Sequence, residues 1–210
     1  MECIMHFFNE YSNFFIVISI GYLLGSIPFG LIFTAMAGLG DIRSVGSGNI
    51  GATNVLRTGR KDLAFFTTVC DIGKAMLAVV LARYMFNNEV EMPLLAGFCA
   101  VLGHNFPIWL WFKGGKGVAS TLGMMIATDF MVGALTAVTW LGVAMISKYS
   151  SLSAIIALTM APIFAWCVID FPEPYMICYG ALAVLALIRH RANIRRLFKH
   201  EESKVSFNRQ

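Results

Sequence analysis

The sequence predicts an all-α integral membrane protein, a bundle of about seven transmembrane helices that forms one domain over residues 1–210. It is 58% hydrophobic and only 13% charged, with a mean hydropathy of +0.70, whereas soluble domains carry roughly 25% charged residues. Apolar runs of about 18 or more residues recur, which is enough to cross a hydrocarbon core of about 30 Å. No Lys or Arg precedes Arg43, so the first run lacks the basic start of a signal peptide and is expected to remain as a helix.

The apolar runs give the expected spans in order. Small residues such as Gly21 and Gly25 favour close helix packing in the first span, and Pro28 is expected to kink its end. A short acidic loop at 87–91 separates the second span from the third. The expected spans are residues 14–37, 63–86, 93–112, 118–128, 130–147, 151–169 and 175–188.

Charge asymmetry decides how often residues 118–147 cross. This run is too long for one untilted helix and short for two, with Thr128 and Asp129 as its only interruption. A single crossing would put Lys148 and the basic tail, up to Arg209, outside, against the preference of Lys and Arg for cytoplasmic loops. Two crossings place all 16 Lys and Arg except Lys74 and Arg83 on one side. We therefore expect an external N-terminus and a cytoplasmic C-terminus.

Three polar segments then share the cytoplasmic face. Residues 42–61 contain four cations and four glycines but no carboxylate, residues 113–117 read Lys-Gly-Gly-Lys-Gly, and the basic tail begins at Arg189. Glycines allow close backbone approach, and clustered amides and cations suit phosphate. Together they predict an anion site at the membrane surface, with headgroup-contacting loops as the alternative. The net charge of +4 is explained by these anchors and does not indicate nucleic acid.

Literal motif matches do not hold in this context. Gly46, Gly48 and Gly51 fit the dinucleotide fingerprint, but that motif requires a preceding strand and a βαβ unit. The segment 113–117 lacks the first Gly and the Ser or Thr of a nucleotide-binding P-loop. No His is followed five residues later by Asp, which argues against the acyltransferases that carry a His-x₄-Asp pair.

Several single residues leave alternatives open. Asp71 and Lys74, at i,i+3 within a span, either form a structural ion pair or line the floor of a polar site. His104, close to Pro107, suits a structural role. The four His residues show no metal-ligand spacing, so no metal is expected. The five Cys residues lack C-x-x-C spacing, and Cys70, Cys99, Cys167 and Cys178 are expected to be buried free thiols.

The chain resembles the PlsY family of bacterial acyl-phosphate:glycerol-3-phosphate acyltransferases along nearly its whole length. The resemblance rests on four ordered motifs: 46–54 with Arg57 and Gly59, 103–107, 113–119, and 190–197. It implies a multi-pass enzyme of the bacterial cytoplasmic (inner) membrane, with its active site facing the cytoplasm. The implied reaction moves a fatty acyl group from acyl phosphate to the 1-hydroxyl of glycerol 3-phosphate and yields lysophosphatidic acid and phosphate.

The resemblance also implies roles for residues. The PlsY family usually has Gly at the position of His200, two residues before Glu202, so the chain departs from the family pattern there. We expect structural roles for Asp71, Lys74 and Glu202. The candidate catalytic residues are Ser47, Arg57, His190 and Asn193. The candidate substrate-binding residues are Gly48, Asn49, Asn54, His104, Lys113, Gly114, Gly115, Lys116 and Gly117.

Both substrates carry phosphate and one carries a fatty tail, which suits two anion-binding loops at a membrane interface. We expect direct transfer, with both substrates held in line, no cofactor, and a monomer in the bilayer. An organic-anion transporter is the alternative of another class. It would place polar groups at the bilayer midplane between inverted repeats, but only Asp71 and Lys74 lie deep and no repeat is visible.

Overall fold

The computed structural model describes residues 2–86 and 89–204, with side chains from residue 11 onward, and every regular element in these ranges is helical. Asn87 of the predicted external loop, Arg209 of the tail and the Cys3 side chain lie outside the described residues. The α-helices are α1 (Glu2–Gly25), α2 (Phe29–Met36), α3 (Ala52–Leu56), α4 (Lys61–Met85), α5 (Glu91–Asn105), α6 (Val118–Thr128), α7 (Phe130–Ser147), α8 (Ser150–Val168), α9 (Glu173–Arg189) and α10 (Arg191–Phe198). Two 3₁₀ helices, η1 (Ile42–Ser44) and η2 (Ile108–Leu110), complete them.

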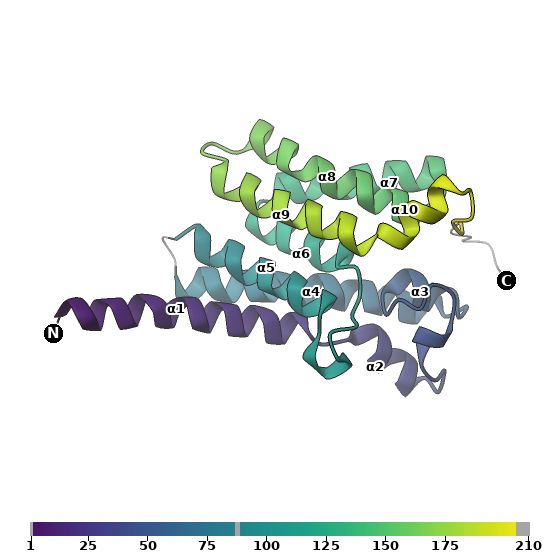
Figure 1. Cartoon of the computed structure of the whole chain (residues 1–210), viewed down its shortest axis with the longest axis horizontal. Helices are drawn as coiled ribbons and strands as arrows, with labels where there is room; N and C mark the ends of the chain where they lie inside the picture. Colours follow the sequence, from purple (N-terminus) through teal and green to yellow (C-terminus); the bar gives the residue numbers. More distant parts are fainter. Residues whose placement is uncertain (1, 87–88, 205–210) are drawn as a thin grey trace.

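The long helices lie side by side in two groups (Figure 1). Helices α1, α4 and α5 form one group, α7, α8 and α9 form the other, and α6 packs between them. Small side chains such as Ala78 and Ala100 fill the core, as expected where helices approach closely in a membrane. The short helices α2, α3 and α10 gather at one end of the bundle, opposite the N-terminus.

Within the described residues, five segments are long and apolar enough to cross a bilayer: Tyr11–Met36, Lys61–Met85, Glu91–Leu110, Phe130–Ser147 and Ser150–Val168. Helices α6 and α9, with 11 and 17 residues, are shorter than the roughly 20 residues of an untilted span. Their existence agrees with the predicted helices at 118–128 and 175–188. Their crossing of the membrane stays a prediction.

The first predicted span is two helices rather than one kinked helix. Helix α1 ends at Gly25 and α2 starts at Phe29, because Pro28 lacks the N–H that would continue the helix. Gly25 packs directly on α5, where a Cβ would lie 2.0 Å from the Ala100 carbonyl oxygen. The break frees the Ile27 carbonyl, which accepts a hydrogen bond from Lys74 Nζ at 2.8 Å. Lys74 on α4 therefore stabilises the break.

The third predicted span ends earlier than residue 112. Helix α5 stops at Asn105, before Pro107, and the chain then turns through η2. Trp111 and Phe112 both have positive φ, a conformation that L-residues adopt rarely. Residues 106–117 consequently fold back toward the end of α5 instead of extending it.

The predicted division of residues 118–147 is confirmed. Asp129 separates α6 from α7 and caps α7, since its carboxylate accepts the Val132 N–H at 2.8 Å. Arg83 Nη2 donates to the Thr128 carbonyl at 3.1 Å and so satisfies the end of α6.

The cysteine prediction is partly wrong. Cys70, Cys99, Cys167 and Cys178 are free thiols, but only Cys99 is buried, and Cys167 is exposed on the outer face of α8. An apolar run does not show which side of a membrane helix faces lipid.

Candidate functional site

A cavity of about 210 Å³ lies where the polar loop before α3, the glycine loop before α6, the start of α8 and the α9–α10 junction meet. The three polar segments, far apart in the sequence, thus converge. Most of the residues singled out from the sequence line this cavity: Ser47, Asn49, Arg57, Asp71, His104, Lys116, Gly117, His190, Asn193 and Glu202.

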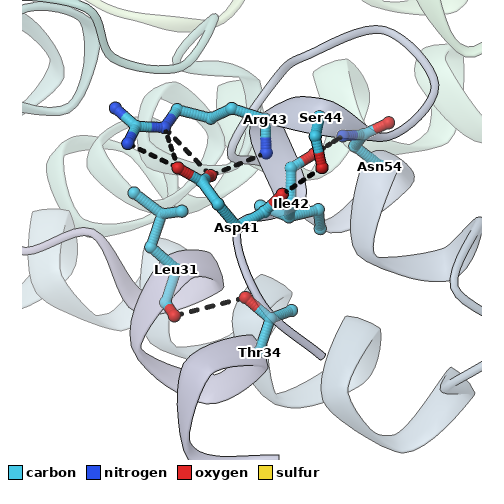
Figure 2. Close-up of polar contacts among 7 residues, drawn as sticks. All are labelled: Leu31, Thr34, Asp41, Ile42, Arg43, Ser44 and Asn54. Atoms are coloured by element: carbon cyan, nitrogen blue, oxygen red, sulfur yellow. Dashed lines mark hydrogen bonds and ion pairs between the residues drawn. The ribbon is translucent and has the colours of Figure 1, made fainter. Parts of the chain in front are cut away.

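Asn54 holds the first loop in shape. Its side chain, 1% exposed, extends from α3. Its Nδ2 donates to the carbonyls of Ile42 at 3.0 Å and Val45 at 2.9 Å, and its Oδ1 accepts the Ser47 N–H at 3.1 Å. Figure 2 shows the contact with Ile42. One amide therefore fixes both ends of residues 42–47.

The glycines in this loop leave room for that arrangement. Gly46 and Gly48 have φ of +56° and +68°, which favours residues without a Cβ. A Cβ on Gly46 would lie 2.6 Å from Asn54 Oδ1 and 2.7 Å from Arg57. The asparagine and the arginine can therefore pack directly beneath the loop.

Arg57 is the cation of this loop that lines the cavity. Arg43 pairs with Asp41 at 2.6 Å, as Figure 2 shows, and Arg60 pairs with Asp62 at 2.6 Å. Arg57 has no carboxylate partner among the described residues. Its guanidinium contacts Asn54 Oδ1 at 3.4 Å and donates to the Ser203 hydroxyl. Its charge is consequently available to an anion.

The glycine loop folds back on the end of α5. Gly114 and Gly115 donate their backbone N–H groups to the carbonyls of Asn105 at 3.2 Å and His104 at 3.0 Å. Arg189 clamps the loop from α9, because its guanidinium donates to the Gly114 carbonyl at 2.8 Å and the Gly115 carbonyl at 2.7 Å. The sequence reasoning gave Arg189 no role in the site.

Some predicted substrate-binding residues do not line the cavity. Lys113 is exposed, and its N–H closes a turn onto the Leu110 carbonyl at 3.0 Å after the two residues of positive φ. The other predicted substrate-binding residues that do not line the cavity belong to the two loops or to α3: Gly48, Asn54, Gly114 and Gly115.

Lys116 extends into the cavity and begins a chain of polar contacts. Its Nζ donates to Asn193 Oδ1 at 2.6 Å, and Asn193 Nδ2 donates to Glu202 Oε1 at 2.6 Å. Burial lowers the pKa of Lys116 to about 8; the nearby Glu202 opposes this shift, and Arg196 and Arg57 add to it. An anion bound here would restore the charged form.

Glu202 connects three parts of the chain. It accepts from Asn193, from Ser151 Oγ on α8 at 2.8 Å and from Arg196 Nε on α10 at 2.7 Å. Burial alone would raise its pKa, but these hydrogen bonds outweigh it and lower the pKa of the Glu202 carboxyl. Glu202 also lines the cavity, and the structural role expected for it stays a prediction.

His190 ends α9 and is 2% exposed. Burial, reinforced by the positive charge of Lys116, lowers the pKa of His190 to about 4. The ring is therefore neutral near pH 7. Its Nδ1 lies 2.8 Å from the Ala186 carbonyl oxygen.

Asp71, Lys74 and His104 form a buried cluster behind the glycine loop. Lys74 Nζ lies 2.7 Å from Asp71 Oδ1 and 3.0 Å from His104 Nδ1. Asp71 and His104 line the cavity, and Lys74 does not. The pair lies within α4 and contacts α5 through His104, and Asp71 lines the cavity, so both interpretations of the pair stay predictions.

Sequence reasoning missed several lining residues that tertiary packing supplies. Ser150 and Ser151 begin α8, where the sequence alone suggests helix capping, and Ser150 Oγ lies 3.3 Å from Thr53 Oγ1. Trp140 lines the cavity from the middle of an apolar run. No local signal distinguishes it from a lipid-facing tryptophan.

A second cavity of about 430 Å³ adjoins the first between α4 and α7. The two share Ala52, Thr53, Thr68, Trp140 and Ser150. Its further lining is mostly apolar, with Leu56, Ala64, Phe65 and Ala144, and it includes Lys61 and Lys148. A cavity lined by Arg57, Lys116 and Glu202 thus lies next to one whose further lining is mostly apolar.

Comparison with known proteins identifies the family. The model of the family described as glycerol-3-phosphate acyltransferase matches residues 15–200. The chain belongs to this family. A glycerol-3-phosphate acyltransferase of Rhodospirillum rubrum is 56% identical over 191 residues, covering 88% of each chain. One from Caulobacter vibrioides is 54% identical over 185 residues, covering 88% of this chain and 84% of the relative.

The fold agrees with a solved member of the family. The crystal structure of the integral membrane glycerol 3-phosphate acyltransferase PlsY in its glycerol 3-phosphate form is similar, with a TM-score of 0.86 and 33% identity over 92% of this chain and 96% of that one. The lysophosphatidic acid form of that protein gives a TM-score of 0.83. The resemblance deduced from the motifs is therefore confirmed, and with it the assignment to an integral membrane acyltransferase.

Replacing Gly115 by alanine should impair the site without unfolding the bundle. A Cβ there would lie 2.0 Å from His104 Nε2, so the ring or the loop must move, and a displacement of about 1 Å can cost on the order of 100-fold in rate. Steady-state kinetics checks this. Gly180→Ala on α9 is the matched control, because its Cβ meets nothing within 4 Å. Unchanged kinetics in Gly115→Ala would contradict the tight contact.

Proposed function

We propose that this enzyme transfers a fatty acyl group from acyl phosphate to the 1-hydroxyl of glycerol 3-phosphate, which begins phospholipid synthesis. The observation that carries the proposal is a cationic chamber, with Arg57 and Lys116, adjoining an apolar chamber between α4 and α7. This substrate pair carries two phosphate groups and one fatty chain, which match the cationic and the apolar cavity. The glycerol 3-phosphate and lysophosphatidic acid forms of the similar PlsY structure support it.

The two phosphates have separate candidate positions. The phosphate of glycerol 3-phosphate suits Lys116 and Gly117, where a half-buried ammonium lies beside the glycine loop. The phosphate of the donor suits Arg57 and Ser47 in the first loop. The acyl chain would occupy the apolar chamber beside Phe65 and Ala144.

This arrangement supports direct transfer. The 1-hydroxyl oxygen forms a bond to the acyl carbon, the bond from that carbon to the phosphate oxygen breaks, and the hydroxyl proton ends on the released phosphate. Arg57 stabilises the charge on the leaving phosphate, and holding the two substrates in line reduces the entropic barrier. Ser47 positions a phosphate or relays a proton, and Asn193 or a backbone amide supports the oxyanion. Trapping an acyl group on Ser47 would instead indicate a covalent route.

We further propose seven crossings, an external N-terminus and a site that opens to the cytoplasm of a bacterial inner membrane. The support is the distribution of Lys and Arg, together with the position of α2, α3 and α10 at one end of the bundle (Figure 1). An impermeant thiol reagent should label Glu89→Cys in intact cells; labelling only after lysis would reverse the topology. We expect a monomer without metal or organic cofactor.

The decisive experiment mixes the purified protein with glycerol 3-phosphate and palmitoyl phosphate and follows phosphate and lysophosphatidic acid together. Equal amounts of both products, formed from acyl phosphate but not from acyl-CoA, would support the reaction. Ser47→Ala and Arg57→Ala should lose most of the activity. Turnover with acyl-CoA alone would overturn the donor. A folded sample without turnover that carries glycerol 3-phosphate into liposomes would favour a transporter.

The affinity for glycerol 3-phosphate should weaken in alkaline solution. In the free enzyme Lys116 loses its proton as the pH rises through about 8, well below its ordinary value of 10.5, so the KM for glycerol 3-phosphate should rise above that pH. Between these two values the unfolded chain binds more protons, so the Lys116 contribution to folding stability should increase with pH. Lys116→Arg should remove the rise in KM, because arginine stays charged. A rise that persists in this variant would assign the titration to another group.

A further inference from the structure

Two histidines line the same cavity. The Nδ1 atom of one contacts a hydrogen-bond donor, and the Nδ1 atom of the other contacts an acceptor. His104 comes from the end of α5 and His190 from the end of α9. Both are buried, with 5% and 2% of their surfaces exposed. Neutral imidazole has one N–H and one lone pair, so the partner at Nδ1 decides which of these Nε2 offers.

The partner of His190 is a carbonyl. The Ala186 oxygen, 2.8 Å from Nδ1, can only accept. Nδ1 must therefore carry the proton, and Nε2 keeps a lone pair. The low pKa of His190, due first to burial and then to Lys116, agrees with a neutral ring.

The partner of His104 is an ammonium. Lys74 Nζ has three acceptors within reach: Asp71 Oδ1 at 2.7 Å, the Ile27 carbonyl at 2.8 Å and His104 Nδ1 at 3.0 Å. An ammonium has three N–H groups and no acceptor. Lys74 makes an ion pair with Asp71 Oδ1, whereas its hydrogen bonds are to the Ile27 carbonyl and to His104 Nδ1, and Nδ1 must therefore accept. The distance from Asp71 Oδ1 to His104 Nδ1 is longer, 3.5 Å. Nε2 of His104 therefore carries the proton and makes no hydrogen bond within the described residues.

We propose that His104 and His190 are held in opposite neutral tautomers, and that together they set the direction in which glycerol 3-phosphate lies. His104 offers an N–H, which a phosphate oxygen accepts. His190 offers a lone pair, which accepts a hydroxyl proton of the glycerol. The inference rests on the proposed function for the identity of the ligand, but the tautomers themselves do not depend on it.

The surroundings of each ring support this direction. His104 Nε2 points at Gly115, since a Cβ there would lie 2.0 Å from it, which puts the donor next to the proposed phosphate loop. His190 lies beside Asn193, whose amide is already bonded to Lys116 and Glu202. Asp71 and Lys74 act through His104 as positioning residues, in addition to linking helices.

Nitrogen-15 NMR of protein labelled at histidine, in detergent near pH 7 and without substrate, tests the tautomers directly. His104→Gln and His190→Gln identify the two rings. We expect Nε2 protonated in one ring and Nδ1 in the other. Asp71→Asn combined with Lys74→Met, which removes both charges of the buried pair, should alter only the pattern of His104. The same tautomer in both rings, or a charged His104, would overturn the proposal whether or not the protein is active.

Kinetics tests the direction of binding. Glutamine can place an N–H near the position of Nε2, whereas asparagine reaches only as far as Nδ1. We therefore expect His104→Asn to raise the KM for glycerol 3-phosphate about 10- to 100-fold, as for loss of a hydrogen bond to a charged group, and His104→Gln to raise it less. The KM for acyl phosphate should stay the same in both. Equal increases for both substrates would indicate a general structural role and overturn the directional one. Absence of turnover in the unmodified enzyme would overturn the proposed function while leaving the NMR result intact.

Discussion

Lys74→Met should be strongly destabilising as well as inactive. The ammonium lies in a buried pair with Asp71, whose side chain is 4% exposed, and removing one partner of a buried ion pair costs about 3–5 kcal/mol. The Ile27 carbonyl at the α1–α2 break also loses the Lys74 donor and keeps only the Phe29 N–H at 3.2 Å, and a lost hydrogen bond to a charged group costs about 1.5–3 kcal/mol. Thermal unfolding in detergent, with activity measured on the same sample, checks both effects.

A second variant separates stability from function. Asp71→Asn combined with Lys74→Met removes both charges, and replacing a buried pair is often close to neutral, so much of the lost thermal stability should return. The activity should stay low, because nothing then fixes the tautomer of His104. Arg83→Met is the matched control on α4: it removes a cation whose only hydrogen bond among the described residues is to the Thr128 carbonyl, and it should destabilise less. A double variant with full activity would show that the pair is purely structural.

Elements whose signals are local could be predicted from the sequence. Asp129 is both a charge in an apolar run and a strong helix N-cap, and the boundary between α6 and α7 falls there. The convergence of the polar loops followed from charge and glycine patterns. Gly46 and Gly48 indeed adopt the positive φ that such a loop requires.

Features that depend on distant partners could not be predicted. The kink expected at Pro28 is a complete break, because Lys74, 47 residues further on, satisfies the carbonyl that the break frees. Trp140 and Ser150 reach the cavity only through the packing of α7 and α8. The tautomers of His104 and His190 likewise depend on a lysine and a carbonyl that no motif specifies.

Asn54→Ala should cause a large loss of activity, because this side chain on α3 holds the first loop. The carbonyls of Ile42 and Val45 would lose the Asn54 donor and keep only the backbone N–H groups of Val45 and Gly48, at about 0.5–1.5 kcal/mol for each lost hydrogen bond. Ser47 would lose the acceptor of its N–H. Because Ser47 and Arg57 are positioned by this amide, we expect turnover to fall by on the order of 100-fold or more, with a smaller fall in the unfolding temperature, since the loop lies at the end of the bundle.

Asn54→Asp separates the acceptor of the Asn54 side chain from its donors. It keeps an acceptor for the Ser47 N–H but sets a carboxylate oxygen against the two carbonyls, so it should be no more active than Asn54→Ala. Thr58→Val is the matched control just beyond α3: within residues 2–86 and 89–204 its hydroxyl bonds only to the Val55 carbonyl and, at 3.5 Å, the Arg60 N–H, and it should keep most of the activity. If Asn54→Asp retained normal turnover, the donors of Asn54 would not be what holds the loop, and the hydrogen bond to Ser47 alone would suffice to position Ser47 and Arg57.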